Sequence, residues 1–254
     1  MTLASATPTR IQLCGSTVID RNGVRLEGRL PGRQGRLLFA YLVLNRHRLV
    51  GRDELIDALW PRESPAATQS GLNSLVSKLR RMLGPGAIEG RSALRLQLGP
   101  DCVVDVEAAL AAVHRAESRV ALGEWAQAWG PSLVALFTAE REFLPGEDLP
   151  WINEQRAELA DVRLRALEAY AAAALGIAGT ELPAAVRAGR RLVRLVPLRE
   201  TGYRVLMRAL AEEGNVAEAL VVYSNLCTVL RDELGVYPSA STQAVYQRLL
   251  GGQR

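Results

Sequence analysis

Small polar and basic residues gather on one side of residues 70–84, which read SGLNSLVSKLRRMLG. With about 3.6 residues per helical turn, the leucines of this stretch fall on one side, and its serines, Asn73 and Arg81 fall opposite. A solvated helix face usually carries acidic and basic residues at i,i+4 spacing. This stretch has no acidic residue. Its polar side is therefore suited to a negatively charged partner.

The side-chain types on this polar side match what a DNA major groove accepts. Short hydroxyl and amide groups can approach base edges, and longer cations at the rim can neutralise phosphates. The candidate DNA-binding residues are Ser70, Asn73, Ser74, Ser77, Lys78, Arg80 and Arg81, with Arg95 from a later segment. The alternative is an ordinary solvated face, which the missing acids disfavour.

The segments around this helix predict the fold that would position it. Asn22-Gly23 between alternating runs indicates a β-hairpin. Helical periodicity follows over 33–45 and 52–60, and Ser64-Pro65 is an N-cap and first-turn signal for the helix with the candidate residues. After Gly84-Pro85-Gly86, alternation over 87–99 indicates a second hairpin. Sheet, three helices and a hairpin form a winged helix-turn-helix, in which the third helix enters the major groove.

Other chemistry-bearing residues do not form a recognisable catalytic or cofactor site. The glycine-rich segment GRLPGRQGR, residues 28–36, lacks the spacing of a nucleotide-binding loop, so we predict a loop leading into a helix. His47 is expected to be a turn residue or a phosphate contact, and the three cysteines are too widely spaced for a zinc site. Four acids within 140–151 are expected in a solvated loop held by Phe143 and Trp151. We therefore expect no cofactor, no metal and no enzymatic activity.

Charge is distributed unevenly along the 254 residues. Residues 1–100 hold 15 Lys+Arg against 7 Asp+Glu, a net charge of +8, and residues 101–254 hold 16 against 20, a net charge of −4. A basic part beside an acidic part is typical of nucleic-acid binding joined to a separate partner-binding region. The N-terminus lacks a secretory pattern and no apolar run is long enough to span a bilayer, so we expect a cytoplasmic, nucleoid-associated protein without a membrane partner.

The second part of the chain is predicted to be helical almost to its end. Helical periodicity continues from residue 101, interrupted by short glycine and proline turns. The stretch from Leu182 resembles the stretch from Val216 at an offset of 34 residues, which is the period of tetratricopeptide repeats. A plain helical bundle with coincidental Ala and Leu spacing is the alternative.

The quoted segments together resemble the Streptomyces antibiotic regulatory proteins. Residues 32–61 and 72–90 resemble the winged helix of that family, and residues 197–239, with FLPGEDLPW at 143–151, resemble its bacterial transcriptional activation domain. The resemblance implies a transcription activator that binds promoter repeats and recruits RNA polymerase. In the second hairpin, the family pattern Gly-Tyr-Arg-Leu is replaced by Ala93-Leu94-Arg95-Leu96, which retains the arginine.

These observations predict a mainly α protein with two domains. Residues 1–100 form a winged helix-turn-helix (α+β), and residues 101–254 form an all-α tetratricopeptide-like domain. The expected function is sequence-specific regulation of transcription on double-stranded promoter DNA. The expected partners are RNA polymerase and a second copy of the chain on DNA. The alternative is a helical-repeat adaptor that binds protein and whose basic domain does not read DNA.

Overall fold

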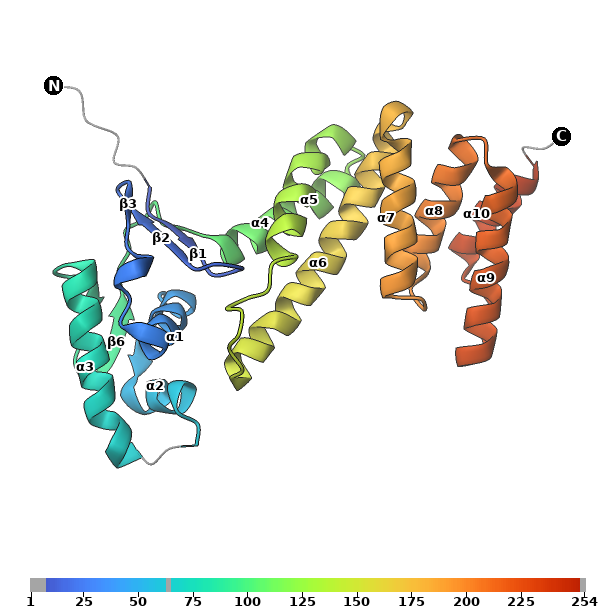
Figure 1. The fold of residues 1–254 in the computed structure, drawn as a ribbon. Helices are drawn as coiled ribbons and strands as arrows, with labels where there is room; N and C mark the ends of the chain where they lie inside the picture. Colours follow the sequence, from blue (N-terminus) through green and yellow to red (C-terminus); the bar gives the residue numbers. More distant parts are fainter. Residues whose placement is uncertain (1–7, 63–64, 252–254) are drawn as a thin grey trace, which may run out of the picture. The chain divides into compact units, whose positions relative to one another are not determined.

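The computed structural model describes residues 8–62 and 65–251 of the chain, which are mainly helical (Figure 1). They form two compact units. The first unit joins Met1–Ala108 to Arg141–Leu159, and the second joins Ala109–Glu140 to Ala160–Arg254. Among the described residues, none of the helices combines the length and the apolar character needed to cross a membrane. The predicted N-cap at Ser64 lies outside the described residues.

The first unit begins with a small sheet in the order β3-β2-β1-β7. Its strands are β1 (Arg10–Gln12), β2 (Val18–Arg21), β3 (Val24–Arg25) and β7 (Val103–Val104). The turn between β2 and β3 has positive φ at both Asn22 (54°) and Gly23 (77°), as a two-residue type I′ hairpin requires. The predicted first hairpin is therefore confirmed. A short 3-10 helix, η1 (Glu27–Arg29), leads from β3 towards the helices.

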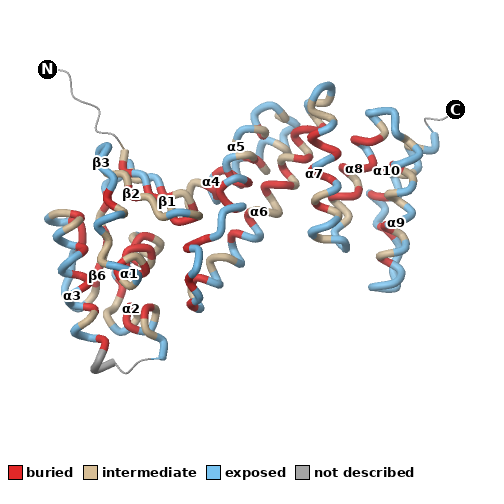
Figure 2. Tube along the Cα trace, in the orientation of Figure 1, coloured by how far each residue is buried: buried red, intermediate tan, exposed pale blue. Residues whose placement is uncertain are grey.

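Three helices and a second hairpin complete the winged helix. The helices are α1 (Gly32–Leu44), α2 (Arg52–Leu59) and α3 (Pro65–Leu83). The hairpin pairs β5 (Ile88–Glu89) with β6 (Ala93–Leu96), and β6 also pairs with β4 (Val50–Gly51). We call the β5–β6 hairpin, residues 88–96, the wing. The core lies where α1, α3 and β6 meet, and it includes the fully buried Leu38, Leu79 and Leu94 (Figure 2).

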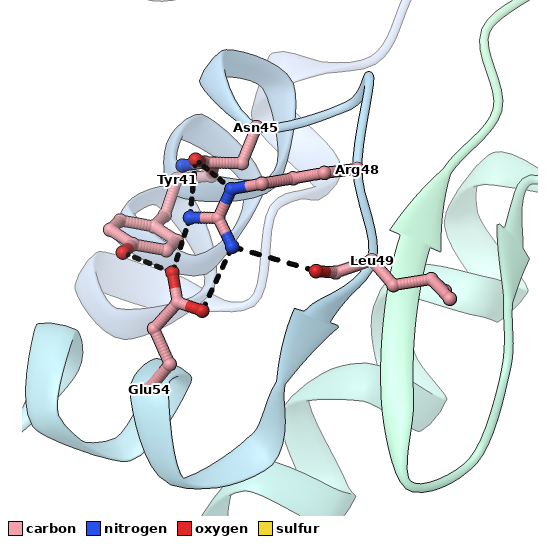
Figure 3. A network of polar contacts seen from close by, with 5 residues as sticks. All are labelled: Tyr41, Asn45, Arg48, Leu49 and Glu54. Carbon is pink, nitrogen blue, oxygen red and sulfur yellow. Dashed lines mark hydrogen bonds and ion pairs between the residues drawn. The ribbon is translucent and has the colours of Figure 1, made fainter.

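A polar network fixes the connection between α1 and α2 (Figure 3). Arg48 donates hydrogen bonds to Asn45 Oδ1 and to both carboxylate oxygens of Glu54, and the Tyr41 hydroxyl donates to Glu54 Oε1 at 2.8 Å. Burial, together with the bond to Glu54, raises the pKa of Tyr41 to about 12. The bond from Arg48 lowers the pKa of Glu54. Glu54 therefore stays ionised and holds the start of α2 against the end of α1.

Residues 141–159 return to the first unit, although they lie well beyond the predicted boundary at residue 100. Phe143 is buried, and the backbone N–H of Leu144 donates to the carbonyl of Leu13. The Trp151 indole donates to the carbonyl of Ala58 at 3.1 Å and meets the Tyr41 ring edge to face. The first unit is thus completed by a segment distant in sequence.

The second unit is built from helices joined by short turns. Besides parts of α4 (Asp105–Ala121) and α6 (Pro150–Ile177), it contains α5 (Trp125–Ala139), α7 (Leu182–Leu195), α8 (Glu200–Glu212), α9 (Val216–Leu234) and α10 (Ala240–Gly251). Helices α7 and α9 start 34 residues apart, as the predicted repeat requires. Gly189 and Gly202 let α7 and α8 approach closely, because a Cβ at Gly189 would lie 2.9 Å from Leu206 Cβ.

Candidate nucleic-acid interface

Helix α3 has the two sides that its sequence predicts. Its buried side packs into the first unit through Thr68, Leu72, Leu75, Val76, Leu79 and Leu83. The seven candidate residues between Ser70 and Arg81 are all exposed. Lys78 and Arg81 form no ion pair with any residue that the structure describes. The exposed side therefore carries cations available to an outside partner, and its contact with DNA stays a prediction.

Arg80 joins α3 to the wing. Its Nε donates to the carbonyl of Ile88 at 3.1 Å, and its Nη2 donates to the carbonyl of Gly90 at 2.5 Å. Gly90 has a φ of 92°, and a Cβ there would lie 1.9 Å from the carbonyl oxygen of Ala93, so this turn requires glycine. The guanidinium that we expected at a phosphate is thus positioned to hold the wing beside α3.

Arg95 lies on the wing, half-buried in β6, and its charge is partly balanced there. Its Nη2 lies 3.1 Å from Glu89 Oε2, which also accepts a hydrogen bond from Gln97. The bonds from Gln97 and Arg95 lower the pKa of Glu89, so this carboxylate stays ionised. Glu89 therefore neutralises part of the positive charge of Arg95, whereas the charges of Lys78 and Arg81 are not balanced in this way. The role of Arg95 in binding DNA stays a prediction.

Arg52 connects three parts of the same surface and was not among the predicted site residues. From the first turn of α2, its Nη2 donates to Asn73 Oδ1, and its Nη1 donates to the carbonyl of Arg91 in the wing turn at 3.2 Å. One signal in the sequence could have indicated this residue, because a cation at a helix N-terminus opposes the helix dipole. Such a cation suggests a role beyond helix formation.

The acidic loop at 140–151 differs in part from the expectation. Phe143 and Trp151 do anchor it. Glu147, however, is buried rather than solvated, with 3% of its surface exposed. Its carboxylate forms ion pairs with Arg33 and Arg36 of α1. A buried carboxylate needs such partners, because ionised groups lose hydration on burial. The loop is therefore a structural clamp on α1.

Within the described ranges, no cluster of three or more His, Cys, Asp or Glu side chains could hold a metal ion. His47 is exposed, and its Nε2 lies 3.7 Å from Glu107 Oε1, an arrangement without a nucleophile. The interface on α3 and the wing is the site that the geometry favours.

Comparisons with protein families match both parts of the chain. Residues 104–250 match the bacterial transcriptional activator domain, and residues 28–92 match the C-terminal domain of transcriptional regulatory proteins. The activator-domain match covers α5 to α9 and nearly all of α10. The match to transcriptional regulatory proteins includes α3 and the wing turn.

Individual proteins are similar over most of this chain. The regulatory protein AfsR of Streptomyces coelicolor is 34% identical over 95% of the chain, which spans 24% of AfsR. The transcriptional regulator RedD of the same organism is 27% identical over 94% of the chain and 70% of RedD. The structure of Mycobacterium tuberculosis EmbR in complex with a low-affinity phosphopeptide aligns with a TM-score of 0.78 at 26% identity, over 97% of this chain and 66% of that one. The chain thus spans about a quarter of the length of AfsR.

Proposed function

The chain belongs to the Streptomyces antibiotic regulatory protein family by its bacterial transcriptional activator domain, and we propose that it binds promoter DNA and activates transcription. The observation that carries this proposal is the exposed side of α3. That side contains no acidic residue and presents Lys78 and Arg81 without ion-pair partners among the described residues. Unbalanced cations beside short polar groups are what a phosphate-lined groove binds.

The proposed reading of DNA places α3 in the major groove. Ser70, Ser77 and Arg81 lie opposite the buried side, at the centre of the exposed side, so these residues approach base edges. Arg81 is the long donor among them, and a guanidinium donates two hydrogen bonds to guanine O6 and N7. Lys78 lies towards one edge of the helix and neutralises a phosphate. The wing, held by Arg80, follows the adjoining backbone.

The second unit is proposed to act on the transcription machinery. In this proposal the helices α5 to α10 contact RNA polymerase, and copies of the chain occupy neighbouring promoter repeats in the cytoplasm. The support is the family to which the unit belongs, together with its arrangement of stacked helical hairpins, a form that commonly binds protein partners. The proposed role is regulatory and not enzymatic.

The test is a charge reversal on the exposed side of α3. Arg81→Glu is expected to abolish specific binding to an operator recovered by mapping the genomic sites of the wild-type chain. Losing one base contact costs about 1–3 kcal/mol at one operator position, and the added negative charge is repelled by phosphates. Because Arg81 is exposed, the melting temperature should not change. Gel-shift titration and thermal melting measure the two quantities.

Arg208→Glu is the matched control, because Arg208 is exposed on α8 of the second unit and the substitution changes the net charge equally. It is expected to bind the operator almost as the wild type does. Near-wild-type binding by a folded Arg81→Glu protein would remove α3 from the interface. That result would favour a helical-repeat adaptor that binds protein.

A further inference from the structure

A basic groove runs along the side of α3. It has a volume of about 380 Å³ and is lined by Arg29, Pro31, Lys78, Arg81 and Met82. Three of these five residues are cations, and none is acidic. Arg29 comes from η1, in the glycine-rich segment 28–36 that leads into α1. We call this feature the Arg29 groove.

The charge of the Arg29 groove is not balanced within the described part of the chain. No ion pair or side-chain hydrogen bond of Arg29, Lys78 or Arg81 is formed there. Other cations of the first unit behave differently: Arg25 pairs with Glu27 at 2.7 Å, and Arg95 pairs with Glu89 at 3.1 Å. Like charges around one groove repel one another unless an anion lies between them. The groove is therefore suited to an anionic ligand.

The Arg29 groove lies on the side of α3 away from the wing. Lys78 and Arg80 are two residues apart, so they point about 200° apart around the helix, with Arg81 between them. Arg80 donates to the wing backbone, and Lys78 lines the groove with Arg29. A helix in a major groove has one phosphate backbone on each side. The wing faces one of these backbones, so the Arg29 groove faces the other.

The loop that carries Arg29 is held in place from both ends. Leu26 is buried, and Glu27 Oε2 accepts a hydrogen bond from the backbone N–H of Ile19 at 3.1 Å. On the other side, Pro31 packs so closely on α1 that a Cβ at Gly35 would lie 2.3 Å from Pro31 Cγ. The position of the Arg29 backbone is therefore fixed by packing before any ligand binds. Binding at this site therefore requires ordering of the Arg29 and Lys78 side chains but not of the loop backbone.

We propose that the Arg29 groove binds a phosphodiester of the DNA strand on the side of α3 away from the wing. Arg29 and Lys78 neutralise the phosphate, and the apolar surfaces of Pro31 and Met82 face the adjoining deoxyribose. This inference rests on the proposed function, because it assigns a second backbone contact to the same duplex. The glycine-rich segment thus contacts a DNA phosphate, and the protein contacts the DNA backbone on both sides of α3.

The test compares Arg29→Ala with Arg25→Ala in the full chain. Both substitutions remove one exposed cation, and the two positions are only four residues apart, but Arg25 is already paired with Glu27 and does not line the groove. For Arg29→Ala, the slope of log K against log salt concentration should become shallower by about 0.9. For Arg25→Ala the slope should stay near the wild-type value. Arg29→Lys should retain most of the slope, because a phosphate also accepts an ammonium group.

Ethylation interference on the mapped operator locates the contact. In the wild type, ethylated phosphates should interfere with binding on both backbones that flank α3. Arg29→Ala should lose the interference on one backbone and keep it on the other. If Arg29→Ala kept the wild-type interference pattern and the wild-type salt slope, the inference would be overturned while the proposed function stood. Equal effects of Arg29→Ala and Arg25→Ala would have the same consequence. If the wild-type chain itself bound no duplex, the proposed function would fail with it.

Discussion

At the scale of single residues, two arginines hold the surface around α3 in place: Arg52 bonds to Asn73, and Arg80 bonds to the wing carbonyls of Ile88 and Gly90. The exposure of Asn73, Ser77 and Arg81 follows from helical periodicity, which the sequence contains directly. Their partners do not follow from periodicity. Arg52 reaches Asn73 across 21 positions, and Arg80 reaches the wing carbonyls across a turn. Such contacts depend on how elements pack, so the sequence identified the cations of the site without indicating which of them hold the protein together.

The Glu54 network offers a residue-scale prediction with a defined pH dependence. Hydrogen bonding to Arg48 lowers the pKa of Glu54 in the folded protein below its ordinary value of about 4.3. Its stabilising effect is therefore fully present above the unfolded pKa, and it is lost as the pH falls through the folded pKa. Glu54→Gln should lower stability at pH 7, and the difference from wild type should shrink as the pH is lowered from about 6 towards 3.

Urea unfolding of both proteins across this pH range measures the difference. Asp53→Asn is the control, because Asp53 is the adjacent carboxylate in α2 but is exposed and takes no part in the network. A constant difference between wild type and Glu54→Gln at all these pH values would mean that the charge of Glu54 is not what stabilises the contact.

At the scale of elements, local signals predicted both hairpins and all three helices of the winged helix. Asn22-Gly23 is sufficient for the first hairpin, because only residues tolerant of positive φ fit both turn positions. The pairing of β6 with β4, however, joins residues more than 40 positions apart, and a strand of two residues leaves almost no periodicity to detect. The sequence therefore predicted the elements more completely than the sheet that joins them.

Arg80 gives the element-scale prediction, because an anchor and a phosphate contact respond differently to lysine. Lysine keeps the charge but cannot reproduce the planar fork that reaches the carbonyls of Ile88 and Gly90. If Arg80 anchors the wing, Arg80→Lys should speed hydrogen exchange of the wing amides and lower stability by roughly 1 kcal/mol. Operator binding should weaken with it.

Hydrogen exchange followed by mass spectrometry over residues 88–96 measures this effect. Arg91→Lys, in the exposed wing turn, is the matched control and should leave exchange unchanged, because the Arg91 side chain makes no hydrogen bond among the described residues. Unchanged exchange and unchanged binding in Arg80→Lys would instead favour a simple electrostatic role for Arg80.

At the scale of the whole molecule, the sequence predicted the two kinds of architecture, but not that residues 141–159 pack with the first unit. A composition shift after residue 100 is visible because net charge and periodicity change there. The return of residues 141–159 to the first unit has no such local signal. Its evidence is tertiary: Phe143 is buried, Glu147 is neutralised by α1, and the Trp151 indole bonds to α2. Apolar and acidic residues in a loop fit either a solvated or a buried environment, and the sequence does not name the partners that decide between the two.

This division leads to a prediction about fragments. Truncating a buried Phe or Trp typically costs about 3–5 kcal/mol, and a whole domain is stable by only about 5–15 kcal/mol. A fragment of residues 1–100 lacks Phe143 and Trp151, and it also lacks Asp105, whose carboxylate accepts the backbone N–H groups of Leu13 and Cys14. We expect this fragment to be largely unfolded at 25 °C and to bind operator DNA poorly.

Joining residues 1–108 to residues 141–159 through a short linker should restore a folded, DNA-binding unit. The two segments meet where Arg141 Nη2 lies 3.9 Å from Asp105 Oδ2, so a Gly/Ser linker of about eight residues, with a typical span of roughly 15 Å, is long enough. Circular dichroism melting should show a cooperative transition for the fusion and none for residues 1–100. The fusion with Phe143→Ala and Trp151→Ala has the same length and should melt like the short fragment. Equal melting of the fusion and the short fragment would show that the return segment contributes nothing to the first unit, and the winged helix would then be complete at residue 100.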